Sequence, residues 1–198
     1  MSTPVTTTMD AYHAAVVSAL ETAFGERVTT YAPYDPANLV DATNPINTPA
    51  LYLQIEATDL EDPPERQPLR GRVLTRQAVA VHLILSTRTG GDLQIALDVM
   101  ASAIAVLVRS ADTASHAVAK AGNRWGLGDA VQAPERVSIV PADWQPGMNG
   151  YDSRVVRFEQ TLYLPADPIA CLAEPEPDPE PDPDPEPDPE PEPDPQGE

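Results

Sequence analysis

The last 25 residues constrain this chain more than any other feature. From Glu174 to Pro195 the sequence alternates an acidic residue with proline, and the whole segment 174–198 holds 11 of the 24 prolines and 12 of the 31 acidic residues. It contains no lysine, no arginine and no apolar side chain other than proline. Such a segment cannot bury enough apolar surface to offset the entropy lost on ordering its backbone. We therefore predict one folded domain over 1–173, with a flexible start at 1–8, and a disordered tail over 174–198.

The charge of the folded part differs from that of the whole chain. The formal net charge is −19, but without the tail 19 acidic residues face 12 basic ones, which leaves −7. This balance argues against specific nucleic-acid binding, which needs clustered cations. The single cysteine, Cys171, excludes an internal disulfide. The start of the chain lacks the pattern of a signal peptide, and the most apolar run, 96–108, is too short to span a bilayer, so we expect synthesis in the cytoplasm and no membrane contact.

Two segments have the apolar spacing of helices. Between Met9 and Phe24 one stripe of apolar residues recurs at helical spacing, with Thr8 placed to cap the start and Gly25 to end the helix. A second helix is predicted from the cap Asp92 to about Val108. Its apolar residues cover most of its circumference, which indicates burial on more than one side. It is either a central core helix or a helix that also meets a neighbouring subunit.

Strand patterns fill most of the remaining domain. They are expected at 27–32, 51–56, 72–86, 136–140 and 154–164, separated by loops rich in proline, glycine and asparagine, and a weak helix at 113–121 is left aside. Short connections between consecutive strands favour antiparallel pairing. The predicted fold class is α+β: an antiparallel or mixed sheet of about four to five strands, two main helices on one face and a long projecting β-hairpin.

The sequence offers little for catalysis. The three histidines are scattered, no second histidine or cysteine stands at metal-ligand spacing, and the glycine-rich run 122–128 (GNRWGLG) fits neither a dinucleotide nor a phosphate-binding motif. We interpret that run as a flexible turn. The acids at 59–65 lie in a proline-rich connection with nothing to raise their pKa. We therefore expect no enzyme, no cofactor and no metal.

The element order and strand character resemble the tail terminator proteins of long-tailed bacteriophages of the Mu-like and lambda-like kinds. The similar segments are an opening amphipathic helix (MDAYHAAVVSALETAFG), the strands ALYLQIEA and RVLTRQAVAVHLILS, the apolar helix GDLQIALDVMASAIAVLV and the closing strand SRVVRFEQTLYLP. The resemblance covers roughly residues 8–165. The acidic proline-rich tail is not part of the family pattern.

The resemblance implies a structural virion protein. Subunits of this family assemble in the host cytoplasm into a hexameric ring, which caps the tail tube, stops its polymerisation and presents a surface to the head–tail connector. An assembly interface is then expected at the arginine cluster and on the apolar helix, at Arg66, Arg70, Arg72, Arg76, Leu97, Met100 and Ile104. The arginines also fit another interpretation, a charged strand edge that discourages aggregation.

Two other functions remain open at the sequence level. The chain fits another neck or head–tail joining component of the same particle. It also fits an acidic protein that sequesters a basic partner through its tail, which proline at every second position keeps extended. The tail equally suits a solubilising extension without a partner.

Overall fold

A computed structural model describes residues 5–34, 46–61, 72–87, 92–110, 122–142 and 150–166. The chain order is helix α1 (Met9–Phe24), the 3-10 turn η1 (Gly25–Arg27), strands β1 (Thr30–Pro33), β2 (Ala50–Glu61) and β3 (Arg72–Ser86), helix α2 (Leu93–Arg109), the 3-10 turn η3 (Gly128–Ala130), and strands β4 (Glu135–Ala142) and β5 (Tyr151–Pro165). The acidic tail and the weak helix predicted at 113–121 lie outside the described residues.

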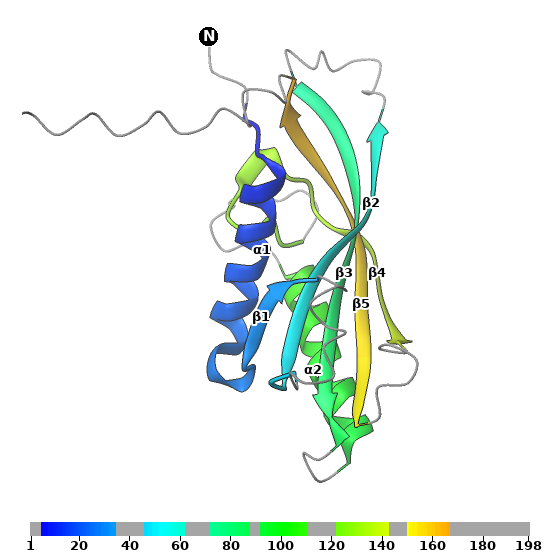
Figure 1. Ribbon diagram of the computed structural model, residues 1–198. Coiled ribbons are helices and arrows are strands. Elements are labelled where there is room, and N and C mark those ends of the chain that lie inside the picture. Colours follow the sequence, from blue (N-terminus) through cyan, green and yellow to red (C-terminus); the bar gives the residue numbers. More distant parts are fainter. Residues whose placement is uncertain are drawn as a thin grey trace, which may run out of the picture.

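The strands form one mixed five-stranded sheet in the order β1-β2-β3-β5-β4 (Figure 1). Strand β1 is parallel to β2, whereas β2–β3, β3–β5 and β5–β4 are antiparallel. The predicted α+β class with a mixed sheet and two main helices is confirmed. The first strand, predicted at 27–32, begins only at Thr30 and ends at Pro33. Residues Gly25–Arg27 form a 3-10 turn that continues the end of α1.

Both helices begin at the caps that the sequence predicts. The Thr8 hydroxyl accepts a hydrogen bond from the Ala11 amide at 3.1 Å, and the Asp92 carboxylate accepts one from the Ile95 amide at 3.2 Å. Each cap satisfies an amide of the first turn that has no partner inside the helix. Helix α1 ends at Gly25, which has φ of +51°, a conformation that costs glycine little.

The core lies between the helices and one face of the sheet. Strand β3 is the central strand of the sheet. Alternate residues of β2, β3 and β5 point toward α1 and α2. This cluster includes Tyr12, Val16 and Leu20 from α1, Leu97, Ala101, Ile104 and Val108 from α2, and Leu51, Val81, Leu83, Val156 and Phe158 from the sheet. Because both helices pack on the same side, the opposite face of the sheet must be stabilised differently.

Gln160 on β5 is the polar centre of this core. Its side-chain oxygen accepts hydrogen bonds from the Tyr12 hydroxyl and the Trp125 indole nitrogen, both at 2.7 Å. Its amide nitrogen donates to the backbone oxygens of Asn123 at 2.9 Å and Gln132 at 2.7 Å. The side chain is 1% exposed, yet its amide is paired on both sides. It thereby ties α1 and the 122–132 segment to the sheet.

The glycine-rich segment 122–128 is not the free turn that the sequence indicated. Trp125 is only 6% exposed and packs against Phe158, with ring centroids 6.1 Å apart. Gly122 approaches the chain closely, since an added Cβ would lie 2.6 Å from Cδ of Pro134. The glycines therefore let this segment fold tightly enough to insert a tryptophan into the core.

His82 lies on the other face of the sheet. Its ring stacks on Tyr34 at 4.7 Å between centroids, and Nε2 hydrogen bonds with Gln54 Oε1 at 2.8 Å. Burial lowers the pKa of His82 from 6.5 to about 4; the neighbouring Glu56 raises it and Arg157 lowers it, both with smaller effects. The folded protein therefore holds this imidazole in its neutral form.

This burial predicts an acid-sensitive contribution to stability. An unfolded chain takes up a proton on His82 near pH 6.5, but the folded chain does so only near pH 4. Stability from this site is therefore complete above pH 6.5 and falls as the pH decreases toward 4. Urea unfolding at pH 7, 5.5 and 4.5 should show a smaller loss in a His82→Gln variant than in the wild type. A His13→Gln control should follow the wild type, and parallel curves for all three proteins would contradict the prediction.

Candidate assembly surface

Helix α2 has a second apolar stripe that the domain does not bury. Ile95, Val99 and Val106 are 60%, 62% and 66% exposed, respectively. Their spacing of four and seven residues places them on one side of the helix. Large aliphatic side chains gathered on one exposed helix face are typical of a surface that another molecule covers.

The α2 residues that were predicted from the sequence to form the interface lie on the side of the helix opposite this exposed stripe. Leu97 and Ile104 are 0% exposed, and Met100 is partly buried against the same core. The placement of Leu97 and Ile104 in an intersubunit contact is therefore corrected: they hold α2 on its own sheet. This side of α2 packs on the sheet because it presents leucine, isoleucine and valine at three- and four-residue spacing. The small Ala101 between them allows the helix to approach the sheet closely.

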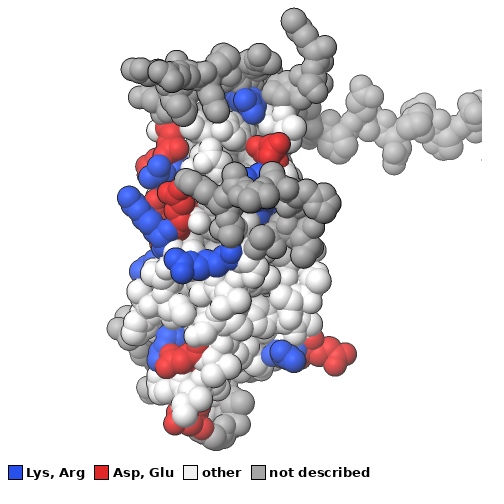
Figure 2. All heavy atoms as spheres, turned by 180° about the vertical axis from the view of Figure 1, so that it is seen from behind, with Lys and Arg blue, Asp and Glu red and all other residues white. Residues whose placement is uncertain are grey.

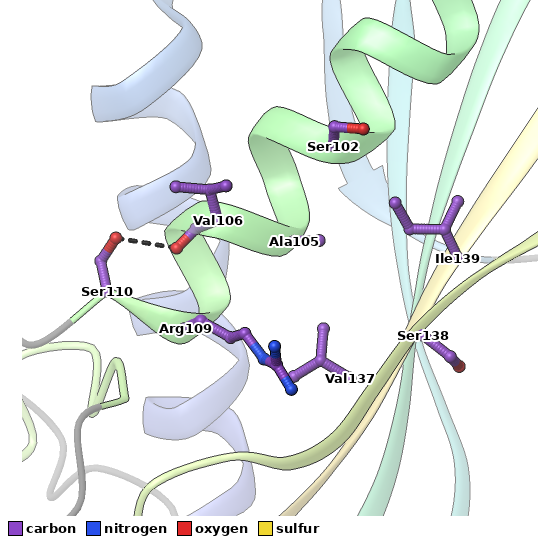
Figure 3. A pocket seen from close by; sticks show the side chains of 8 residues that line it. All are labelled: Ser102, Ala105, Val106, Arg109, Ser110, Val137, Ser138 and Ile139. Carbon is purple, nitrogen blue, oxygen red and sulfur yellow. Dashed lines mark hydrogen bonds between the residues drawn. The ribbon is translucent and has the colours of Figure 1, made fainter.

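A groove of about 610 Å³ separates the C-terminal half of α2 from the edge strand β4. Figure 3 shows Val106 and Arg109 extending from the helix, and Val137 and Ile139 from the strand. Ile139 is 40% exposed. The described residues that line the groove carry mainly aliphatic and small hydroxyl side chains, and Arg109 is the cation among them. This lining suits an apolar side chain of another polypeptide better than a charged small molecule.

The structure divides the predicted arginine cluster. Arg66 and Arg70 lie outside the described residues. The Arg72 guanidinium lies over the Tyr163 ring, 4.5 Å from its centroid. Arg76 forms ion pairs with Glu61 and, at 3.5 Å, with Glu159. Arg72 and Arg76 are thus engaged within the subunit and do not present a bare cationic patch.

Arg76 belongs to an ion-pair ladder that crosses four strands on the sheet face opposite the helices. Glu61 of β2 pairs with Arg76 of β3, Arg76 with Glu159 of β5, and Glu159 with Arg136 of β4 at 2.8 Å. A second pair, Glu56–Arg157 at 2.9 Å, joins β2 to β5. Figure 2 shows the resulting interleaving of basic and acidic side chains on one flank of the molecule. The ladder begins with an acid at β2 and ends with a base at β4.

Reversing the charge at the centre of this ladder should destabilise the fold moderately. An Arg76→Glu variant would place three carboxylates side by side on neighbouring strands. Because these groups are partly exposed, we expect a loss of about 1 to 2 kcal/mol in the free energy of unfolding. Denaturant titration at 0.05 M and 1 M salt should show that the loss shrinks at high salt. A loss that does not depend on salt would show that packing, not charge, matters at this position.

Within the described ranges there is no group of three or more histidine, cysteine or acidic side chains that could hold a metal ion. Of the helices in those ranges, neither is long and apolar enough to cross a membrane. No known family model and no curated protein matches this chain.

Sequence reasoning missed the groove and the sheet edges. The groove depends on how far α2 stands from β4, which no local pattern encodes. The sequence showed that the second helix has more apolar residues than one buried side requires. It did not show which side of the helix faces the core and which side stays exposed. The pairing of Arg76 with residues 15 and 83 positions away required the strand order and register.

Proposed function

We propose that this protein is a structural subunit of a bacteriophage tail, a tail terminator that forms a ring on the end of the tail tube. The observation that carries the proposal is the uncovered stripe of Ile95, Val99 and Val106 on α2. A subunit that spends its working life in an assembly can retain such a surface, because a partner buries it.

The architecture supports the same proposal. The chain order of α1, three strands, α2 and two further strands is the order on which the resemblance to tail terminators rests. A mixed sheet with both helices on one face leaves the free edges of its strands available for neighbours. In the proposed particle the ring consists of six copies, stops tube growth and presents a surface to the head–tail connector.

The finer features of the expected fold also belong to this proposal. We assign the hairpin of β2 and β3 to contacts at the ring, either with a neighbouring copy or with the tube. The pairing of its two strands runs up to Glu61 and Leu74. The tail over 174–198 is proposed to stay outside the ring, so removal of 174–198 should leave folding intact.

Tube growth provides the direct test. Purified tube protein of the particle is allowed to polymerise with increasing amounts of this protein, and tube lengths are measured by electron microscopy. The proposal predicts shorter tubes with a ring-shaped density at one end. Tubes that grow to the same lengths at all ratios, with bare ends, would rule out a terminator. Rings that leave tube length unchanged but bind the connector would favour another neck component instead.

A further inference from the structure

The sheet has two strand segments, one near each edge, that lack a neighbouring strand on one side. On one side, β1 pairs with β2 only from Ala50 to Leu53, so residues 54–61 of β2 have no neighbouring strand among the described residues. On the other side, β4 is the last strand, and residues 138–142 pair regularly with β5 alone. Each edge presents backbone amide and carbonyl groups that another strand can bind.

The strand directions allow these two edges to pair between copies. Strand β2 is antiparallel to β3, β3 to β5, and β5 to β4, so β2 and β4 run in opposite directions within one subunit. A second copy moved sideways in the plane of the sheet would therefore bring its β2 antiparallel to the β4 of the first. No inversion of the copy is required.

The register of this contact follows from β1. The pairings place Gln54 of β2 in the same row as Ala80, Arg157 and Ser138 of β4. Because β1 occupies the β2 edge as far as Leu53, the incoming β4 must shift toward the far end of β2. Because an irregularity between Ile55 and Ala57 adds one residue to β2, Ala57 lies only two rows beyond Gln54, in the row of Ala78. A shift of two rows, about 7 Å, therefore brings Ala57 opposite Ser138 on the same face of the sheet, and places Asp59 opposite Arg136.

Charges on the sheet face opposite the helices agree with that register. It places Asp59 beside Arg136 of the next copy. Asp59 is exposed and its carboxylate forms no ion pair with a described residue, and the Arg136 side chain is 71% exposed despite its contact with Glu159. The ladder that runs from an acid on β2 to a base on β4 would then continue across the boundary with its alternation intact.

Apolar contacts on the helix face agree as well. Leu60 of β2 pairs across the strand with Thr75, which points to the helix side, and it is 79% exposed, more than any other described large hydrophobic residue. In the shifted register Leu60 lies next to β4 on the side of the groove lined by Val106, Val137 and Ile139. One copy thus offers an uncovered leucine where the other offers an apolar groove.

We propose that copies of this chain join head to tail by pairing the β2 edge (residues 54–61) of one with the β4 edge (135–142) of the next. The contact combines a backbone ladder, the Asp59–Arg136 pair and insertion of Leu60 into the α2–β4 groove. It is heterologous, since two different surfaces meet, and its repetition closes a ring where the rotation from copy to copy divides a full turn. The inference rests on the proposed function only for the meaning of that ring.

Disulfide trapping tests the pairing. In a background with Cys171→Ser, one variant carries Ala57→Cys and another Ser138→Cys, each replacing a small exposed residue. Facing residues of an antiparallel pair have the Cα separation that a disulfide needs. We expect the mixture to form mainly the mixed disulfide dimer and each variant alone to form little. Equal or greater linking within either single variant, or no linking at millimolar protein, would overturn the proposal.

Charge exchange provides a second, independent measurement on the full chain. Asp59→Arg and Arg136→Asp should each weaken self-association by at least about 10-fold, and the double variant should recover most of that loss. Additive losses without recovery would contradict the pairing. A ring of normal mass without Ala57–Ser138 linking would overturn this interface but leave the terminator proposal intact. Rings that show the Ala57–Ser138 link but fail to stop tube growth would support this interface and overturn the terminator proposal.

Discussion

Replacing Gln160 with leucine is expected to lower the free energy of unfolding by about 3 to 5 kcal/mol, because buried polar groups left without partners are costly. The substitution would strand the Tyr12 hydroxyl and the Trp125 indole donor, together with the backbone oxygens of Asn123 and Gln132. Burial raises the pKa of Tyr12, so its hydroxyl remains a protonated donor in need of an acceptor. Urea titration followed by tryptophan fluorescence measures the loss directly.

A matched control separates this effect from the general loss of a glutamine. The exposed side chain of Gln132 donates to the Tyr163 hydroxyl at 3.2 Å. A Gln132→Leu variant should lose less than about 1 kcal/mol, since its partners can turn to water. If Gln160→Leu costs as little as this control, the buried network is not the element that joins α1 and the 122–132 segment to the sheet.

A Val99→Asp substitution is expected to prevent assembly without unfolding the subunit. Val99 is 62% exposed on α2, so the free energy of unfolding should change by no more than about 0.5 kcal/mol. In an assembled interface the same carboxylate would be desolvated at the centre of an apolar stripe. The expected cost of at least about 2 kcal/mol per contact corresponds to a loss of affinity of roughly 30-fold or more.

The control for this variant is Ala14→Asp, which places the same charge on an exposed position of α1. Thermal unfolding should be nearly unchanged in both proteins, and tube capping should be lost only with Val99→Asp. Normal capping by Val99→Asp would show that the α2 stripe stays in solvent. The stripe would then no longer support the proposed function.

Much of the fold could be predicted because local rules decide it. The Thr8 and Asp92 caps, the stop at Gly25 and the alternation along 72–86 each depend on neighbours in sequence, and the structure places helices and a strand there. The parallel pairing of β1 with β2 was not predicted, since it depends on how the chain returns through 34–49. The burial of Trp125 likewise depends on a partner, Gln160, 35 residues away.

The candidate surface was harder to predict for the same reason. Sequence showed that the second helix is apolar on two sides, but only packing shows that Leu97 and Ile104 face the core while Ile95 and Val99 face outward. The arginine cluster looked like a basic patch, because the acids that pair with Arg76 come from other strands. Residue types were informative about the presence of an interface, and topology was needed to locate it.

The native mass of the full chain tests the central claim that this protein works as an assembled ring. Native mass spectrometry or light scattering over a range of concentrations, with and without tail tubes, is the measurement. The account predicts a closed ring of six copies, either alone or once tubes are added. A monomer at every concentration that also ignores tubes would contradict it and would favour an acidic protein that binds a basic partner through residues 174–198.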